Sequence, residues 1–122
     1  MMLIGELAQK TGLTRDTIRF YEKMGLISAS DRPAGTRVYK EFSENMMERL
    51  LLIHQAKTLG FTLNEIKQLL QAWGDHSKIP KSEQVRIVER KIEEISQKRH
   101  QLAEIESYLT VKLNRLKHEI NR

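Results

Sequence analysis

Two short amphipathic patterns open the chain and are separated by a glycine. The first apolar set recurs at the spacing of one helical face and consists of Leu3, Ile4, Leu7 and Ala8. The second set follows Gly12 and Leu13 and runs from Thr17 and Ile18 to Tyr21. Two short helices joined by a turn that contains glycine are typical of a helix-turn-helix. An ordinary helical hairpin with a solvated charged face is the alternative interpretation.

The residues at the start of the second helix favour the helix-turn-helix. Thr14 lies where its hydroxyl can cap the helix by accepting a hydrogen bond from a backbone N–H two or three residues later. This arrangement places Arg15, Asp16 and Arg19 on the exposed face near the helix N-terminus. In this motif, the first residues of the second helix contact base edges in the major groove. The pattern therefore predicts a DNA-recognition helix.

Residues 28–41 predict a two-stranded hairpin, or wing, beside these helices. A turn with proline and glycine precedes the alternating segment 37–39, which is typical of a short strand. Arg32 and Arg37 offer guanidinium groups that match phosphate, and Tyr39 offers a hydroxyl. Packing of Tyr39 in the core is the alternative for that residue.

A second pair of helices is predicted over residues 43–73. Ser43 is the expected N-cap of the first helix, and Gly60 ends it in the left-handed conformation. Thr62 and Glu65 have the spacing of a capping box at the start of the second helix. We expect this pair to pack against the first two helices.

The last third of the chain has the pattern of a coiled coil. After a turn-rich linker at 74–81, apolar residues in segment 82–122 recur at alternating spacings of three and four. Arg99 and Glu106 occupy two further positions of this seam. One isolated helix would leave the seam in water, so the pattern predicts a partner helix. The apolar seam residues are Val85, Val88, Ile92, Ile95, Leu102, Leu109, Leu113, Leu116 and Ile120.

Composition excludes several classes of function. The 122 residues suffice for one compact domain and an appendage. Cysteine is absent, which excludes disulfides and thiolate metal sites. Neither a membrane span nor a signal peptide is expected, so we predict a cytoplasmic protein. The four histidines have no carboxylate spacing typical of a general base or metal site, so we expect neither catalysis nor a cofactor.

The net charge of +5 is unevenly distributed along the chain. Residues 1–40 contain 7 basic and 4 acidic side chains, an excess that coincides with the predicted DNA-binding motif. Residues 80–122 contain 10 basic and 7 acidic side chains, which interleave as on a solvated helix. The first excess agrees with attraction to phosphate, although net charge alone is weak evidence for a nucleic-acid partner.

Three segments together resemble the MerR family of bacterial transcription regulators: LIGELAQKTGLTRDTIRFYEKMGLI, DRPAGTRVYKEF and ERLLLIHQAKTLGFTLNEIKQLL. The resemblance covers nearly the whole chain. One departure is Thr36 in the wing, where the family usually has an aromatic residue. The resemblance implies a mainly α fold, with a winged helix-turn-helix domain at 1–73 and an antiparallel coiled coil at 82–122.

The resemblance also implies a function and its partners. The expected protein is a homodimer that binds a pseudo-palindromic promoter site in double-stranded DNA and distorts the spacer to control RNA polymerase. The expected dimer contacts are Val88, Ile92, Ile95, Arg99, Leu102 and Leu109. The expected DNA contacts are Thr14, Arg15, Asp16, Thr17, Arg19, Phe20, Tyr21, Arg32, Arg37 and Tyr39.

The sequence is also compatible with two other functions. One is a non-switching DNA-architectural or excision factor with the same fold. The other is a helical adaptor that binds only proteins. Transcription from a promoter with a long spacer distinguishes the regulator from the architectural factor, and DNA affinity distinguishes both from the adaptor.

The inducing signal is not identified by the sequence. Metal-sensing members of the family place a thiolate or a serine near the start of the dimerisation helix, where this chain has Lys81 and Ser82. Lys81 is a candidate switch residue that contacts the partner subunit in place of a metal or binds an anionic effector. A solvated lysine is the alternative. His76 in the linker is a further candidate. Because the sequence ends at Arg122, we expect neither the Cys-rich loop nor the effector domain that other family members have.

Overall fold

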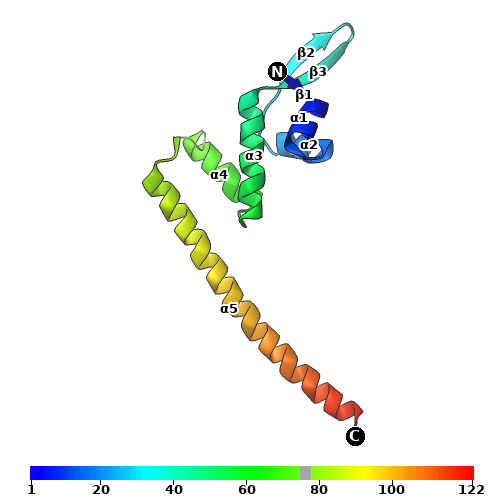
Figure 1. Ribbon diagram of the computed structural model, residues 1–122, viewed down its shortest axis with the longest axis vertical. Coiled ribbons are helices and arrows are strands. Elements are labelled where there is room, and N and C mark those ends of the chain that lie inside the picture. The colour runs from blue at the N-terminus through cyan, green and yellow to red at the C-terminus, as the bar shows by residue number, and fades with distance from the viewer. Residues whose placement is uncertain (75–77) are drawn as a thin grey trace. The chain divides into compact units, whose positions relative to one another are not determined.

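The computed structural model describes residues 1–74 and 78–122, which belong to two units, Met1–Lys78 and Ile79–Arg122 (Figure 1). The predicted switch residue His76 lies outside the described residues. The second unit contains helix α5, Lys81–Ile120. The first contains, in chain order, β1 (Met2–Leu3), α1 (Ile4–Thr11), α2 (Arg15–Lys23), β2 (Ser30–Ala34), β3 (Arg37–Phe42), α3 (Glu44–Thr58) and α4 (Leu63–Trp73).

The wing is part of a three-stranded antiparallel sheet in the order β1-β3-β2. Strands β2 and β3 form the predicted hairpin, and Gly35 in its turn has a φ of 66° that favours glycine. Strand β1 adds the pair Met2↔Phe42 on the other side of β3. Our placement of Leu3 on the face of the first helix was wrong, because Leu3 belongs to β1. A two-residue strand is too short to show any hydrophobic periodicity.

One buried cluster joins the elements of the first unit. Its largest fully buried side chains come from α1, α2, the loop after α2, β3 and α3: Leu7, Ile18, Leu26, Phe42, Leu50 and Ile53. Burying an apolar side chain of this size contributes about 1.5–3 kcal/mol. The cluster therefore holds α2 against the sheet and α3, which leaves the opposite side of α2 for solvent. Met46 and Met47 of α3 pack against the cluster.

Both predicted boundaries of α3 are confirmed. The Ser43 hydroxyl accepts a hydrogen bond from the backbone N–H of Met46 at 3.2 Å, which caps the first turn. Gly60 follows the helix with a φ of 94°. Because few side chains tolerate this backbone conformation, glycine ends α3 at little cost in free energy.

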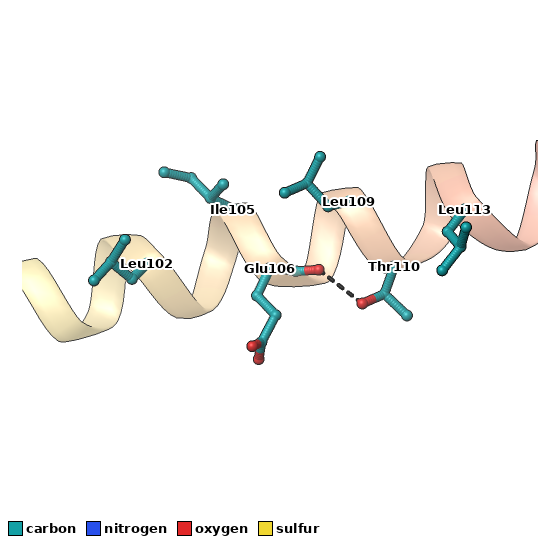
Figure 2. A pocket seen from close by; sticks show the side chains of 6 residues that line it. All are labelled: Leu102, Ile105, Glu106, Leu109, Thr110 and Leu113. Carbon is teal, nitrogen blue, oxygen red and sulfur yellow. Dashed lines mark hydrogen bonds between the residues drawn. The ribbon is translucent and has the colours of Figure 1, made fainter.

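Helix α5 is continuous over 40 residues and includes the segment after residue 110. The predicted seam residues Val88, Ile92, Ile95, Leu102 and Leu109 are 47–66 % exposed. Ile105, which the predicted seam omits, lies beside this apolar surface, and Figure 2 shows it on the same side of the helix as Leu109. Glu106, which we placed in the seam, points away from both in this view. No helix among residues 1–74 and 78–122 has the length and apolar character needed to cross a membrane.

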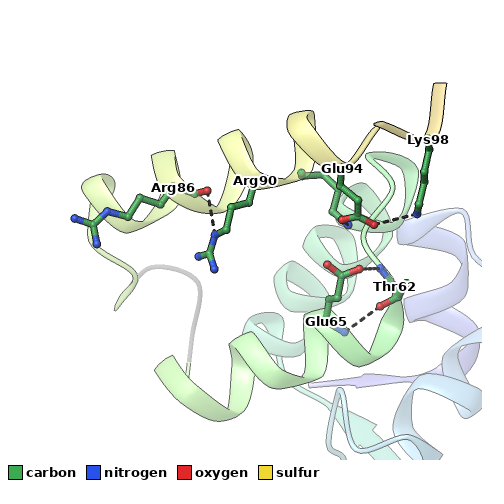
Figure 3. A network of polar contacts seen from close by, with 7 residues as sticks. Thr62, Glu65, Arg86, Arg90, Glu94 and Lys98 are labelled. Atoms are coloured by element: carbon green, nitrogen blue, oxygen red, sulfur yellow. Dashed lines mark hydrogen bonds and ion pairs between the residues drawn. The ribbon is translucent and has the colours of Figure 1, made fainter. Parts of the chain in front are cut away.

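Local polar contacts stabilise helices in both units (Figure 3). At the start of α4, the predicted capping box is present: the Thr62 hydroxyl accepts from the Glu65 N–H, and the Glu65 carboxylate accepts from the Thr62 N–H. In α5, Lys91 and Lys98 each donate to Glu94 at 2.9 Å. The hydrogen bonds from Lys91 and then Lys98 hold the pKa of Glu94 below its ordinary value.

Candidate nucleic-acid interface

The start of α2 is fixed by two threonines. The Thr14 hydroxyl accepts a hydrogen bond from the Thr17 N–H at 3.1 Å and donates one to the Thr17 hydroxyl at 2.8 Å. The predicted N-cap is therefore confirmed. The same contacts occupy the Thr14 hydroxyl proton, so this hydroxyl can only accept a hydrogen bond from a further partner unless the bond to Thr17 opens.

Three charged side chains project from the first turns of α2. Arg15, Asp16 and Arg19 are exposed, as their positions opposite the buried face of the helix require. Arg19 Nη1 lies 3.4 Å from Asp16 Oδ1, in an ion pair in which 95 % of the Asp16 side chain is exposed. An exposed pair of this kind contributes little free energy. Arg19 can therefore leave Asp16 for a phosphate or a base at small cost.

The two aromatic residues of α2 face different surroundings. Phe20 is 48 % exposed, whereas Tyr21 is 3 % exposed and belongs to the core. The resemblance implied that Tyr21 contacts DNA, and its burial in the core corrects that expectation. The helical period turns Tyr21 toward the same side as Ile18, and burial raises the pKa of its phenol above the ordinary value of 10.0.

The wing presents its basic residues on exposed strands. Arg32 on β2 pairs with Tyr39 on β3, and Arg32 Nη1 lies 3.1 Å from Glu41 Oε1. Tyr39 is 40 % exposed, so the alternative in which it packs in the core is wrong. Arg37 is exposed next to the turn of the hairpin. The wing therefore offers two guanidinium groups and one phenol to a partner.

An ion pair that the sequence did not indicate connects the wing to α2. Lys40 Nζ on β3 lies 3.1 Å from both carboxylate oxygens of Glu22 on α2. Only 19 % of the Glu22 side chain is exposed, which reduces screening by water. The pair links the wing to the helix that contains Arg15 and Arg19. Eighteen residues separate the two partners, so no local spacing could have revealed the contact.

The predicted switch residues form no recognisable site in the described residues. Lys81 is the first residue of α5, and both Lys81 and Ser82 are exposed. Across residues 1–74 and 78–122, no three side chains of the metal-binding types come together in a group that could hold a metal ion.

Comparison with known proteins identifies the family. A family model described as MerR HTH family regulatory protein matches residues 2–73, and one described as MerR, DNA binding matches residues 47–111. The chain belongs to the MerR family. As a MerR-family member with these helices and this wing, it is a DNA-binding transcription regulator.

Individual relatives agree with this assignment. An uncharacterised HTH-type transcriptional regulator from Pseudomonas aeruginosa is 38 % identical over 112 residues, which cover 85 % of this MerR-family chain and 82 % of the relative. The transcription regulator PbrR691 from Ralstonia metallidurans, solved in complex with lead(II), has a TM-score of 0.73 and 33 % identity. That match covers 90 % of this chain and 83 % of PbrR691.

A third relative was solved on DNA. EcmrR, in an EcmrR–DNA complex within EcmrR-RPo, has a TM-score of 0.71 and 25 % identity, and the match covers 97 % of this MerR-family chain and 40 % of EcmrR. These relatives are regulators, a class of protein that in general does not catalyse reactions.

Tyr21→Phe tests the burial of this phenol in the MerR-family fold. Because the folded pKa is raised, the neutral phenol's contribution to stability is complete below about pH 10 and is lost as the pH rises through the folded pKa. The variant should therefore lose less stability than the parent above about pH 10. Urea unfolding across this range measures the difference. Tyr108→Phe, at a ring that is 77 % exposed, is the control. Equal alkaline losses in Tyr21→Phe and the parent would contradict the prediction.

Proposed function

We propose that two copies of this MerR-family chain bind a pseudo-palindromic promoter site and distort its spacer to control RNA polymerase. The observation that carries the proposal is the exposed pair Arg15 and Arg19 at the start of α2, fixed next to an exposed basic wing by the Lys40–Glu22 pair. EcmrR, a structural relative, was solved in an EcmrR–DNA complex within EcmrR-RPo, which supports DNA as the partner. Bacterial promoters lie in the cytoplasm, where we place the protein.

Helix α2 and the wing have different proposed roles in DNA binding. Arg15 and Arg19 enter the major groove with α2, where an arginine can donate two hydrogen bonds to guanine. Thr14, Asp16, Thr17 and Phe20 line the same part of the helix. Arg32, Arg37 and Tyr39 of the wing contact phosphates, which fix the register but do not specify sequence.

Helix α5 supplies the dimer contact in this proposal. In a single chain, the exposed apolar residues of α5 would remain in contact with water. Packing against the same surface of a second copy removes this apolar surface from water. We keep Val88, Ile92, Ile95, Leu102 and Leu109 in this interface, with Arg99 at its polar position. A coiled coil of two copies sets the distance between the two recognition helices and thereby the spacing of the half-sites.

The regulatory step is a change in DNA shape. By resemblance to the family, the dimer bends and untwists a promoter spacer that is too long for RNA polymerase to contact both promoter elements. Deformation on this scale costs about 1–10 kcal/mol, which protein–DNA contacts offset. An inducing signal of a few kcal/mol then suffices to change the state. The 122 residues contain no cysteine, so a thiolate site for a soft metal cannot form from them. Lys81 and Ser82 remain candidates for an effector contact.

Arg19→Ala tests the DNA contact. The parent is first used to select an operator from a random duplex library, and affinity is then measured by fluorescence anisotropy at several salt concentrations. If Arg19 contacts a base, the variant should bind about 1–3 kcal/mol more weakly and with relaxed specificity. If it contacts phosphate, the salt slope should fall by about one. Arg115→Ala removes the same charge from α5 and is the control. Parental affinity and slope in Arg19→Ala would contradict the proposed surface.

Ile95→Asp tests the dimer. A carboxylate at this position of the seam would be buried without a partner, which costs several kcal/mol. Sedimentation at micromolar concentration should show a dimer for the parent and monomer or unfolded chain for the variant. Gln101→Asp introduces the same charge on α5 away from the seam and should remain dimeric. A monomeric parent would refute the interface.

Spacer length tests the regulatory mechanism. Transcription in vitro is measured with RNA polymerase, with and without the protein, on the selected operator placed in promoters whose spacer shortens by single base pairs. Activation should occur at the long spacer and disappear as the spacer approaches the length that polymerase uses unaided. A DNA-architectural factor would bind all these promoters without changing transcription.

A further inference from the structure

The guanidinium of Arg15 lies across the first turn of α1, against a residue that has no side chain. A Cβ atom built on Gly5 would lie 2.9 Å from Arg15 Nη2, 3.5 Å from Cζ and 3.8 Å from Nε. The first of these distances is shorter than real Cβ contacts, so any larger residue at position 5 would displace the guanidinium. Arg15 thus occupies the space that the missing side chain leaves.

The backbone does not explain the glycine at this position. Gly5 lies within α1, and it is not among the five glycines that have a positive φ. Glycine is less favourable than alanine in a helix, because it loses more conformational entropy on folding. Position 5 therefore tolerates alanine as far as α1 is concerned. The three outside atoms nearest to the added Cβ all belong to the Arg15 guanidinium, which is the flexible end of that side chain.

The position of the Arg15 guanidinium over Gly5 affects the proposed DNA contact, because Arg15 is the first residue of α2. A guanidinium that rests on the backbone of α1 samples fewer rotamers before DNA binds, so less side-chain entropy is lost on binding. We propose that Gly5 is a positioning residue for DNA recognition, which acts by letting the Arg15 guanidinium pack on α1 in the orientation used on the operator. The inference rests on the proposed function, in which Arg15 contacts DNA.

A double-mutant cycle of Gly5→Ala and Arg15→Ala tests the proposal in the full chain, with the selected operator as probe. Arg15→Ala alone should weaken binding about 5- to 150-fold, as expected for one arginine–base contact. Gly5→Ala alone should weaken binding by about threefold or more, with a melting temperature equal to or above that of the parent. Adding Gly5→Ala to Arg15→Ala should change affinity no further, because the guanidinium it displaces is already absent.

The controls separate this inference from the function on which it rests. Gln9→Ala, at an exposed position of α1, should leave affinity unchanged. If Arg15→Ala weakens binding but Gly5→Ala leaves it unchanged or increases it, the positioning role is refuted and the proposed DNA surface stands. Equal weakening by Gly5→Ala in both backgrounds also refutes it, because the effect would then bypass Arg15. If Arg15→Ala has no effect while Arg19→Ala weakens binding, Arg15 is not a DNA contact. The inference about Gly5 is then refuted, and the proposed function stands.

Discussion

Burial of Ile18 and Tyr21 on one side of α2 sets the direction in which the other side chains of that helix point. Residues on a helix advance by about 100° each, so a buried pair at this spacing turns Arg15 and Arg19 outward. Ile18 packs in the same cluster as side chains of α1, β3 and α3. The DNA-contacting face that we propose therefore depends on a small apolar core, and changes in that core would alter the orientation of its arginines.

Acidic side chains accompany the basic residues of the candidate interface, and their burial suggests different roles. Glu22 and Glu41 are each 19 % exposed and hold Lys40 and Arg32 in place. Asp16 is almost fully exposed, and its ion pair with Arg19 is easily replaced by a phosphate or a base. Glu22 and Glu41 thus restrict the positions of Lys40 and Arg32. Asp16 pairs with Arg19 only in the absence of a partner that binds the arginine more strongly.

Helix α5 poses a separate physical problem. Its exposed apolar residues recur along the helix from Val85 to Ile120, and an isolated helix gains no stability from such a stripe. Exposed ion pairs along the helix, such as the one between Lys98 and Glu94, contribute little to its stability. Under the proposed function, folding of α5 and pairing of two chains are coupled, so the concentration of protein controls both.

Local sequence was sufficient for the helices and for the capped starts of α2, α3 and α4. Apolar periodicity and the caps at Thr14, Ser43 and Thr62 involve residues within four positions of each other, so the pattern alone predicted them. It also identified Arg15 and Arg19 as exposed residues of the candidate interface. The motifs together indicated the MerR family.

Only the tertiary structure decided contacts between distant residues. The pairing of β1 with β3 joins residues some 40 positions apart, and the Lys40–Glu22 pair and the Gly5–Arg15 contact also cross between elements. The structure also corrects the DNA role that the resemblance implied for Tyr21, because this side chain is buried in the core. These contacts depend on which elements pack together, and the local periodicity of one element contains no information about its partners in another.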